Sequence, residues 1–258
     1  MSAVLRRLLA HPLTRDLSAD DPRTTELRRS IVRDKPFLRK IYLEWYEKIL
    51  AALPNGDGGV LELGSGAGFF GELYPGAITS EVFHCSGVRV VLDAQRLPFS
   101  DGALRAIVMT DVMHHIPEAE AFLAEARRVL RPEGRVLMIE PWVTTWSSFI
   151  YTRFHSEPFR TDAPRWGFSS TGPLSGANGA LPWIVFKRDA DRFARLFPEL
   201  AVIALEPFMP FRYLISGGVS MRSLTPGWSF WLWKALERRL DRWRDRLAMF
   251  AFIGLERH

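Results

Sequence analysis

The chain has 258 residues, of which 47% are hydrophobic and 24% are charged, a composition that suits one large globular domain. Its single cysteine, Cys85, excludes an internal disulfide and a cysteine metal cluster. No apolar run is long enough to span a bilayer, and Arg6 and Arg7 interrupt the N-terminal apolar stretch that a signal peptide would need. We therefore expect a soluble cytoplasmic protein.

The net charge of +5 is concentrated at the two ends of the chain. Residues 1–50 carry a net charge of +4 and residues 226–247 a net charge of +3, so the rest is slightly acidic. Flanks of this kind are typical of solvated helix faces, with a membrane surface or an acidic partner as the next interpretation. Binding to nucleic acid is the least favoured interpretation of these basic flanks.

The N-terminal part is predicted to be helical. Apolar residues recur at helical spacing at Val4, Leu5, Leu8 and Leu9, and then every four residues at Phe37, Ile41, Trp45 and Ile49. Prolines punctuate these helices, and the glycine-rich loop 54–59 leads into the first strand. We expect residues 1–55 to form a helical lid.

Residues 60–70 read as a buried strand, a glycine turn and the start of a helix, an arrangement that holds nucleotides. Gly64, Gly66 and Gly68 would let a ligand approach the backbone closely. Glu62 at the end of the strand would repel a pyrophosphate, so its charge favours a cationic ligand such as S-adenosylmethionine. A dinucleotide stays an alternative, because Gly66, Gly68 and Gly71 fit the G-x-G-x-x-G spacing.

Strand and helix patterns alternate after the turn, which indicates a parallel sheet. Strands are predicted at 78–83, 88–93, 103–110, 135–140, 201–206 and 248–255, and helices at 69–74, 117–130 and 189–197. Two segments break this rhythm, residues 142–187 and 207–247. Long insertions at the edge of the sheet that binds ligands are usually functional.

Both insertions are rich in tryptophan, with four of the nine in each. This suggests an aromatic, isoprenoid or lipid-like substrate. The second insertion ends in a predicted helix over 226–247, whose apolar stripe comprises Trp228, Trp231, Leu232, Leu236, Leu240, Trp243 and Leu247. We favour a helix packed across the sheet edge with its basic face in water, and peripheral membrane contact through 226–247 is the alternative.

Several signatures occur together at consistent spacings over residues 58–141. They are the turn 60–68, Glu81, Asp93-Ala94-Gln95-Arg96-Leu97-Pro98-Phe99, the segment 106–116 and Leu130-Arg131-Pro132-Glu133-Gly134-Arg135. In combination the chain resembles the class I, Rossmann-like S-adenosylmethionine-dependent methyltransferases of the small-molecule branch. The resemblance implies a doubly wound α/β domain with a seven-stranded, mostly parallel sheet and an antiparallel last strand. Residues 56–141 would form its cofactor-binding half and the insertions its substrate side.

The resemblance also implies roles for individual residues. Glu62 would face the methionine amino group, and Glu81 would accept hydrogen bonds from the ribose hydroxyls. Asp93 would accept a hydrogen bond from the adenine amino group. The complete set implied to bind the cofactor is Glu62, Gly64, Ser65, Gly66, Gly68, Glu81, Asp93, Ala94, Gln95, Thr110, Asp111 and His115.

Methyl transfer from a sulfonium requires mainly alignment in a dry pocket, and a base only if the acceptor must lose a proton. His114, His115 and His155 are the candidate catalytic residues, with a structural role as the alternative for each; Glu140 is also well placed. No metal site is expected, because His114 and His115 are adjacent and should point in different directions.

The sequence thus predicts an enzyme that methylates a small-molecule acceptor. Two other functions stay open. The basic flanks would suit an RNA or DNA methyltransferase, although no N-P-P-Y-like tetrapeptide follows the fourth strand. The second alternative is a non-catalytic protein that binds the cofactor; the intact Glu62, Asp93 and glycine turn argue against this function.

Overall fold

A computed structural model describes residues 10–14, 17–18, 20–155, 157–172 and 174–258. The helical pattern expected at residues 4–9 lies outside these ranges. At the centre is one seven-stranded sheet in the order β3-β2-β1-β4-β5-β7-β6. Its strands are β1 (Gly59–Leu63), β2 (Ala77–Glu81), β3 (Val90–Val91), β4 (Leu104–Thr110), β5 (Leu130–Pro141), β6 (Leu200–Phe208) and β7 (Phe250–Arg257).

The strand directions match the expected fold class. The pairs from β3 through β5 are parallel, and β7 runs antiparallel to both β5 and β6. The central strands β1 and β4 and the second half of β5 are covered on both faces, which explains why their sequences are mostly apolar. The carboxyl ends of β1, β2 and β4 therefore meet at one edge, where α/β sheets bind their ligands.

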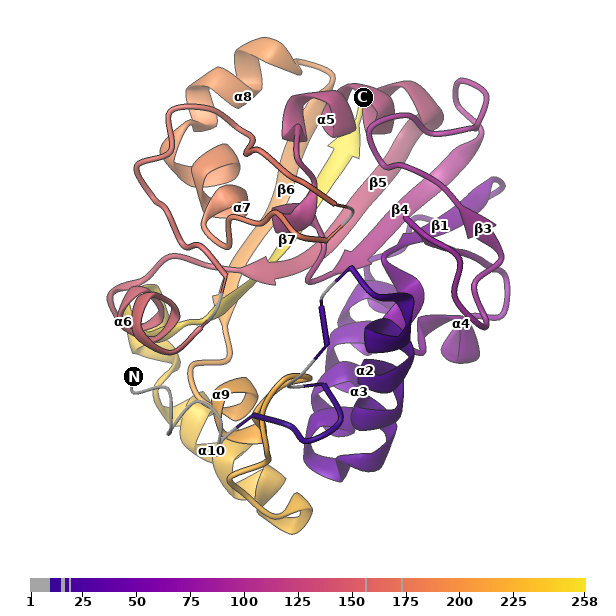
Figure 1. Ribbon diagram of the computed structural model, residues 1–258. Helices are drawn as coiled ribbons and strands as arrows, with labels where there is room; N and C mark the ends of the chain where they lie inside the picture. The colour runs from indigo at the N-terminus through magenta and orange to yellow at the C-terminus, as the bar shows by residue number, and fades with distance from the viewer. Residues whose placement is uncertain (1–9, 15–16, 19, 156, 173) are drawn as a thin grey trace.

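Helices cover both faces of the sheet (Figure 1). One face packs against α5 (Ala119–Val129), α7 (Leu181–Trp183), the π-helical turn η3 (Ile184–Arg188) and α8 (Ala190–Leu196). The other packs against α2 (Pro22–Asp34), α3 (Pro36–Ala51), α6 (Thr145–Phe154) and α9 (Arg212–Ser216). The short elements η1 (Ser65–Ala67), α4 (Phe70–Leu73) and η2 (Met113–His115) lie in the loops after β1 and β4.

The N-terminal helices are fixed by local sequence signals. The Asp21 side chain accepts a hydrogen bond from the backbone N–H of Arg23 and caps α2. Lys35 is extended because Pro36 follows it, which separates α2 from α3. The predicted stripe of α3, which comprises Phe37, Ile41, Trp45 and Ile49, is fully buried against the sheet, as its spacing indicates.

The segment after residue 226 differs from the prediction of a single packed helix. It is divided into η4 (Gly227–Ser229), α10 (Phe230–Arg239), η5 (Asp241–Trp243) and α11 (Arg244–Leu247). Its apolar stripe faces outward, with Trp228, Trp231 and Leu232 exposed to 73%, 61% and 65%. The opposite side of α10 is anchored instead, because Phe230 packs edge-on against Phe37 and the Glu237 carboxylate pairs with Arg212.

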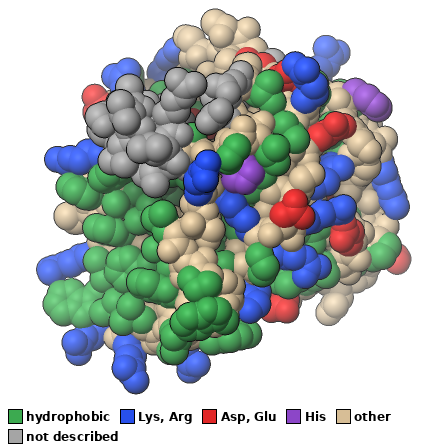
Figure 2. All heavy atoms as spheres, turned by 60° about the horizontal axis from the view of Figure 1, so that its bottom comes forward, with side chains coloured by type: hydrophobic (Ala, Val, Ile, Leu, Met, Phe, Trp, Pro, Cys, Tyr) green, Lys and Arg blue, Asp and Glu red, His purple; other side chains and the backbone are tan. Residues whose placement is uncertain are grey.

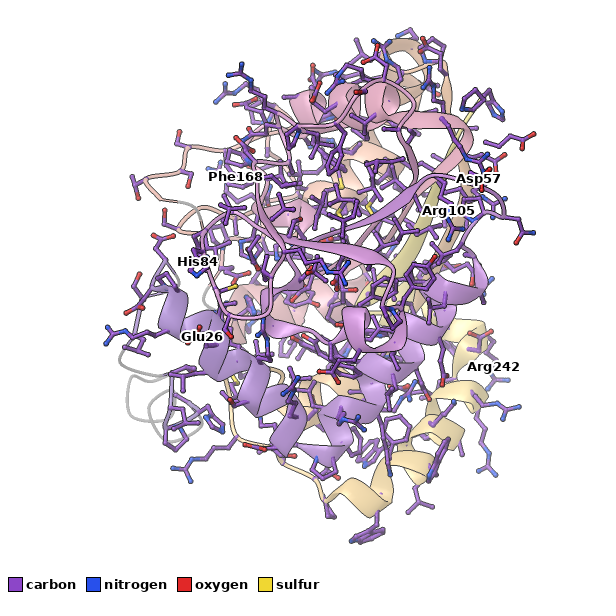
Figure 3. The ribbon with its side chains drawn as sticks, turned by 90° about the vertical axis from the view of Figure 1, so that its right-hand side faces the viewer. Glu26, Asp57, His84, Arg105, Phe168 and Arg242 are labelled. Carbon is purple, nitrogen blue, oxygen red and sulfur yellow. The ribbon has the colours of Figure 1, made fainter. Side chains whose placement is uncertain are left out.

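The surface around the segment after residue 226 carries hydrophobic side chains beside many Lys and Arg side chains (Figure 2). The exposed apolar residues there are Leu224, Trp228, Trp231, Leu232, Leu236 and Trp243, which we call the apolar patch. Arg242 projects from the same helical segment toward solvent (Figure 3). Among the helices of the described ranges, none is both long and apolar enough to cross a membrane.

Candidate active site

A cavity of about 350 Å³ opens at the carboxyl ends of β1, β2 and β4. Its volume lies in the range of small-molecule sites. The strand ends contribute one wall, helices α2 and α3 contribute Thr25, Arg28 and Tyr42, and the two insertions close the far side. The predicted residues that line the cavity are Gly64, Glu81, Asp93, Ala94, Gln95, Thr110, Asp111, His114, His115 and His155.

The glycine turn is shaped by its protein neighbours as much as by a ligand. Gly64 has a φ of 67° and lines the cavity, and a side chain there would collide with Val112. A side chain on Gly66 would collide with Thr25 of α2, and one on Gly68 with the Tyr46 hydroxyl of α3. Two of the three glycines are therefore required by the close approach of the N-terminal helices, a role that the sequence did not reveal.

Glu62 is not among the residues that line the main cavity. Residues alternate across β1, so the Glu62 side chain shares a face with Val60 and points toward the α3 side of the sheet. It lines a second, smaller cavity with Ser65 and Gly68, and Gly66 lines neither cavity. Oε2 of Glu62 is buried with no hydrogen-bond partner in the described structure, and burial raises the pKa of this carboxyl to about 7.

Glu81 and Asp93 both line the main cavity. The buried Glu81 carboxylate accepts hydrogen bonds from the backbone N–H of Gly66 at 3.1 Å and of Val82 at 3.0 Å. Burial raises its pKa. Asp93 is exposed at the cavity rim, and its Oδ1 accepts from the backbone and side-chain amides of Gln95. Both acids are positioned by backbone groups next to the cavity.

Asp111 follows β4 directly and has a left-handed backbone, with a φ of 63°. Its N–H donates to the Ile139 carbonyl at 2.8 Å, which ties this conformation to the neighbouring strand. Burial raises the pKa of Asp111 to about 6. Its Oδ1 lies 4.0 Å from Nε2 of His114, so the strand end and the histidine pair form one polar cluster.

His114 lies on η2 and is held by a buried carboxylate. Its Nδ1 is 2.8 Å from Oε2 of Glu140, whose Oε1 accepts from the N–H groups of Val112 and Met113. Its Nε2 is 3.5 Å from Oε2 of Glu157. Burial alone lowers the pKa of His114, but hydrogen bonds to Glu140 and Glu157 outweigh burial and raise it well above the ordinary value.

His115 converges on the same carboxylate. Its Nε2 lies 3.9 Å from Oε2 of Glu157, its Nδ1 lies 3.3 Å from the Gly176 carbonyl, and the two imidazole rings are 4.2 Å apart. The expectation that adjacent histidines point in different directions is therefore wrong. The tight turn of η2 keeps both rings on the cavity side, and the first insertion places Glu157 opposite them. Burial and the neighbouring His114 lower the pKa of His115 to about 4.

His155 completes the group of three predicted histidines. Its Nδ1 is 3.8 Å from Oε2 of Glu157 and accepts a hydrogen bond from the Glu157 backbone N–H at 3.3 Å. All three histidines thus surround Glu157, a residue that the sequence did not single out. An acidic residue two positions after a histidine in a loop carries no distinctive pattern, so only the fold reveals it.

The aromatic wall of the cavity differs from the prediction. None of the nine tryptophans is among the described residues that line it. Trp142 and Trp166 are buried in the core beside α5 and α8, and others form the apolar patch. The rings that do line the cavity are Tyr42, Tyr151, Phe159, Tyr213 and Phe250. Arg28, also missed, lines it with an Nε that has no partner among the described residues.

Part of the chain is similar in sequence to known methyltransferases. Residues 61–138 match the family model described as a methyltransferase domain. A demethylmenaquinone methyltransferase from Beutenbergia cavernae is 39% identical over 57 residues, 22% of this chain and 24% of that protein. A ubiquinone/menaquinone biosynthesis C-methyltransferase from Caulobacter vibrioides is 31% identical over 116 residues, 43% of this chain and 40% of that protein. The matches thus span less than half of either relative.

Solved structures share the fold. A geranyl diphosphate C-methyltransferase from Streptomyces coelicolor A3(2), in complex with Mg²⁺, geranyl diphosphate and S-adenosyl-L-homocysteine, has a TM-score of 0.50 at 14% identity, covering 97% of this chain and 92% of that one. An S-adenosylmethionine-dependent methyltransferase from Thermotoga maritima has a TM-score of 0.51 at 14% identity, covering 84% and 89%. The chain thus shares the fold of class I S-adenosylmethionine-dependent methyltransferases. Residues 61–138 are similar in sequence to a methyltransferase domain.

The described residues fit S-adenosylmethionine, the cofactor of this class. Acids stand at the ends of β2 and β4 and after β3, where hydroxyl, ammonium and amino donors need acceptors. The unpartnered Nε of Arg28 offers a cation for a carboxylate. The cavity therefore provides acceptors and a cation that complement both charged ends of an amino-acid moiety.

Proposed function

We propose that the protein transfers the methyl group of S-adenosylmethionine to a small acceptor bound in the same cavity. The observation that carries this proposal is the shared cavity of Glu81, Asp93 and Asp111 with the histidine cluster and the tyrosine-rich wall. The bound cofactor supplies an already activated methyl group. The chain then has to hold acceptor and donor in line and exclude water, which contributes roughly 7–11 kcal/mol to such reactions.

Each polar residue along the strand ends has a role toward the cofactor. Glu81 would accept from the ribose hydroxyls, since its carboxylate is already fixed by Gly66 and Val82. Asp93 at the rim would accept from the adenine amino group. Asp111 would face the methionine ammonium and Arg28 its carboxylate, which gives the two charged ends opposite partners.

The acceptor side of the cavity is aromatic with one polar corner. Tyr42, Tyr151 and Tyr213 form much of the wall, and burial raises the pKa of all three phenols, so they stay neutral. The polar corner is the cluster of His114, His115 and Glu157. This combination favours an acceptor with an aromatic or isoprenoid body and one polar group next to the methylated atom.

The apolar patch supports a peripheral contact with an anionic membrane surface. The ammonium groups of Lys40 and Lys234 lie 5.9 and 5.3 Å from the Trp231 ring centroid, and the Arg242 and Arg246 guanidiniums stand over Trp243. Exposed tryptophans flanked by cations are typical of interfacial helices. A lipid-like acceptor would be drawn from such a surface into the cavity.

Transfer of labelled methyl groups tests the proposed function. The purified protein, with labelled S-adenosylmethionine, should label the lipid-soluble fraction of a bacterial extract, and Glu81→Ala should abolish labelling. Incorporation into RNA instead would favour the nucleic-acid alternative. Tight binding of the cofactor without labelling of any fraction would favour a non-catalytic binding protein.

A further inference from the structure

Three potential ligand atoms converge at the polar corner of the cavity. His114, His115 and Glu157 each offer one atom, and these atoms lie within 4.8 Å of one another. The two Nε2 atoms are 3.5 and 3.9 Å from Oε2 of Glu157. Donors bound to one ion at about 2.1 Å lie roughly 3 to 3.5 Å apart, so small shifts of these side chains, on the order of an ångström, would complete a coordination triangle.

The other nitrogen of each imidazole is already engaged. Nδ1 of His114 meets the buried Glu140 carboxylate at 2.8 Å, and Nδ1 of His115 meets the Gly176 carbonyl at 3.3 Å. An acceptor at Nδ1 fixes the tautomer that leaves a lone pair on Nε2. A carboxylate or carbonyl behind each histidine is the arrangement found behind histidines that bind metals. Glu140 is itself fixed by two backbone N–H groups.

The electrostatics of this corner suit a dication. Asp111, Glu140 and Glu157 place three carboxylates around the two imidazoles, and Oδ1 of Asp111 lies 4.0 Å from Nε2 of His114. A divalent ion bound at the two Nε2 atoms would neutralise part of this negative charge.

We propose that His114, His115 and Glu157 form a binding site for one divalent transition-metal ion, with Glu140 orienting His114. Two imidazoles and one carboxylate favour zinc, iron(II) or cobalt(II) over magnesium. The remaining coordination positions face the cavity. If the proposed function holds, on which this role rests, the ion anchors an acceptor through an oxygen atom beside the methyl donor.

Cobalt(II) titration tests the site independently of methyl transfer. Full-length protein without an affinity tag is stripped with a chelator and titrated with cobalt(II), followed by visible absorption and calorimetry. We expect one equivalent to bind with visible d–d bands, and zinc to displace it. Glu157→Gln and His115→Ala should lose the bands, and Glu140→Gln should weaken affinity by about 10- to 100-fold.

His84→Asn is the matched control, because this histidine is exposed on the loop after β2 (Figure 3) and is not among the residues that line the cavity. It should bind cobalt(II) as the wild type does. The site is refuted if the wild type does not bind one saturable equivalent of cobalt(II). It is also refuted if Glu157→Gln and His115→Ala, shown by circular dichroism to be folded, bind cobalt(II) as the wild type does. Binding of S-adenosylhomocysteine is measured on the same samples, so that failure of the metal site is distinguished from failure of the proposed function.

Discussion

The backbone N–H of Gly66 donates a hydrogen bond to Oε1 of Glu81 at 3.1 Å, which ties the glycine turn after β1 to the acid at the end of β2. The Gly66 carbonyl accepts from Nε of Arg29 in α2 at 2.7 Å. The turn is therefore held between the sheet and the N-terminal helix. A side chain on Gly66 would collide with Thr25 and with Glu81, which both line the cavity, so the positions of these two residues depend on a glycine here.

Gly66→Ala should destabilise the protein. The added methyl group would collide with Thr25 and with the Glu81 carboxylate, and overpacking of this kind lowers the free energy of unfolding by about 1–3 kcal/mol. Gly76→Ala is the control, since a methyl group there meets only ordinary contacts with Tyr74. Urea denaturation of both variants measures the difference. Equal stability of Gly66→Ala and Gly76→Ala would contradict the predicted collision at Gly66.

Glu62→Gln should stabilise the protein at alkaline pH. Because burial raises the pKa of Glu62 from 4.5 to about 7, the folded state binds its proton more tightly than the unfolded state. This stabilisation is complete below about pH 4.5 and is lost as the pH rises through 7. At pH 8 the variant should therefore gain on the order of 3 kcal/mol relative to wild type, and almost nothing at pH 4.5. Thermal unfolding at both pH values checks this, and a gain independent of pH would contradict it.

The double variant Trp228→Ser/Trp231→Ser should lose binding to anionic vesicles. Wild-type protein is expected to co-sediment with phosphatidylglycerol vesicles at low salt and to be released at high salt, because exposed tryptophans and nearby cations contribute together. Leu196→Ser, which removes another exposed apolar side chain on α8, should bind like wild type. The membrane proposal fails if the wild type stays in solution at low salt.

His155→Ala should lower the single-turnover rate of methyl transfer less than tenfold. Nδ1 of His155 accepts the Glu157 N–H, so the neutral ring carries its proton on Nε2 and has no further lone pair to accept one. A general base contributes about 10²–10⁴-fold. A loss above a hundredfold would assign His155 the role of base and contradict the structural argument.

Much of the fold follows from local patterns in the sequence. The apolar spacing of α3, the amphipathic pattern of α5 and the alternation of strands and helices all depend on neighbours within a few residues. The strand-end acids Glu81, Asp93 and Asp111 were predictable for the same reason, since each directly follows a strand or belongs to a recognisable segment.

The missed features depend on contacts between distant residues. Glu157 meets His114 across 43 positions, and no local pattern reports that encounter. The direction of the Glu62 side chain was not predicted, because the face of a five-residue strand depends on its register against the helices. The apolar stripe of α10 has a clear period, but periodicity does not say which side of a helix is buried. The buried side is the one that carries Phe230 and Glu237, and Glu237 pairs with the distant Arg212.

Binding of S-adenosylhomocysteine by calorimetry tests the central claim most directly. Wild-type protein should bind one equivalent, and Asp93→Ala should bind about 10- to 100-fold more weakly, because a hydrogen bond to a charged group contributes about 1.5–3 kcal/mol. Asp101→Ala, an exposed acid that pairs only with Arg128 among the described residues, should bind like wild type. Absence of saturable binding by the wild type, or equal affinity of the two variants, would contradict the assignment of this cavity to the cofactor.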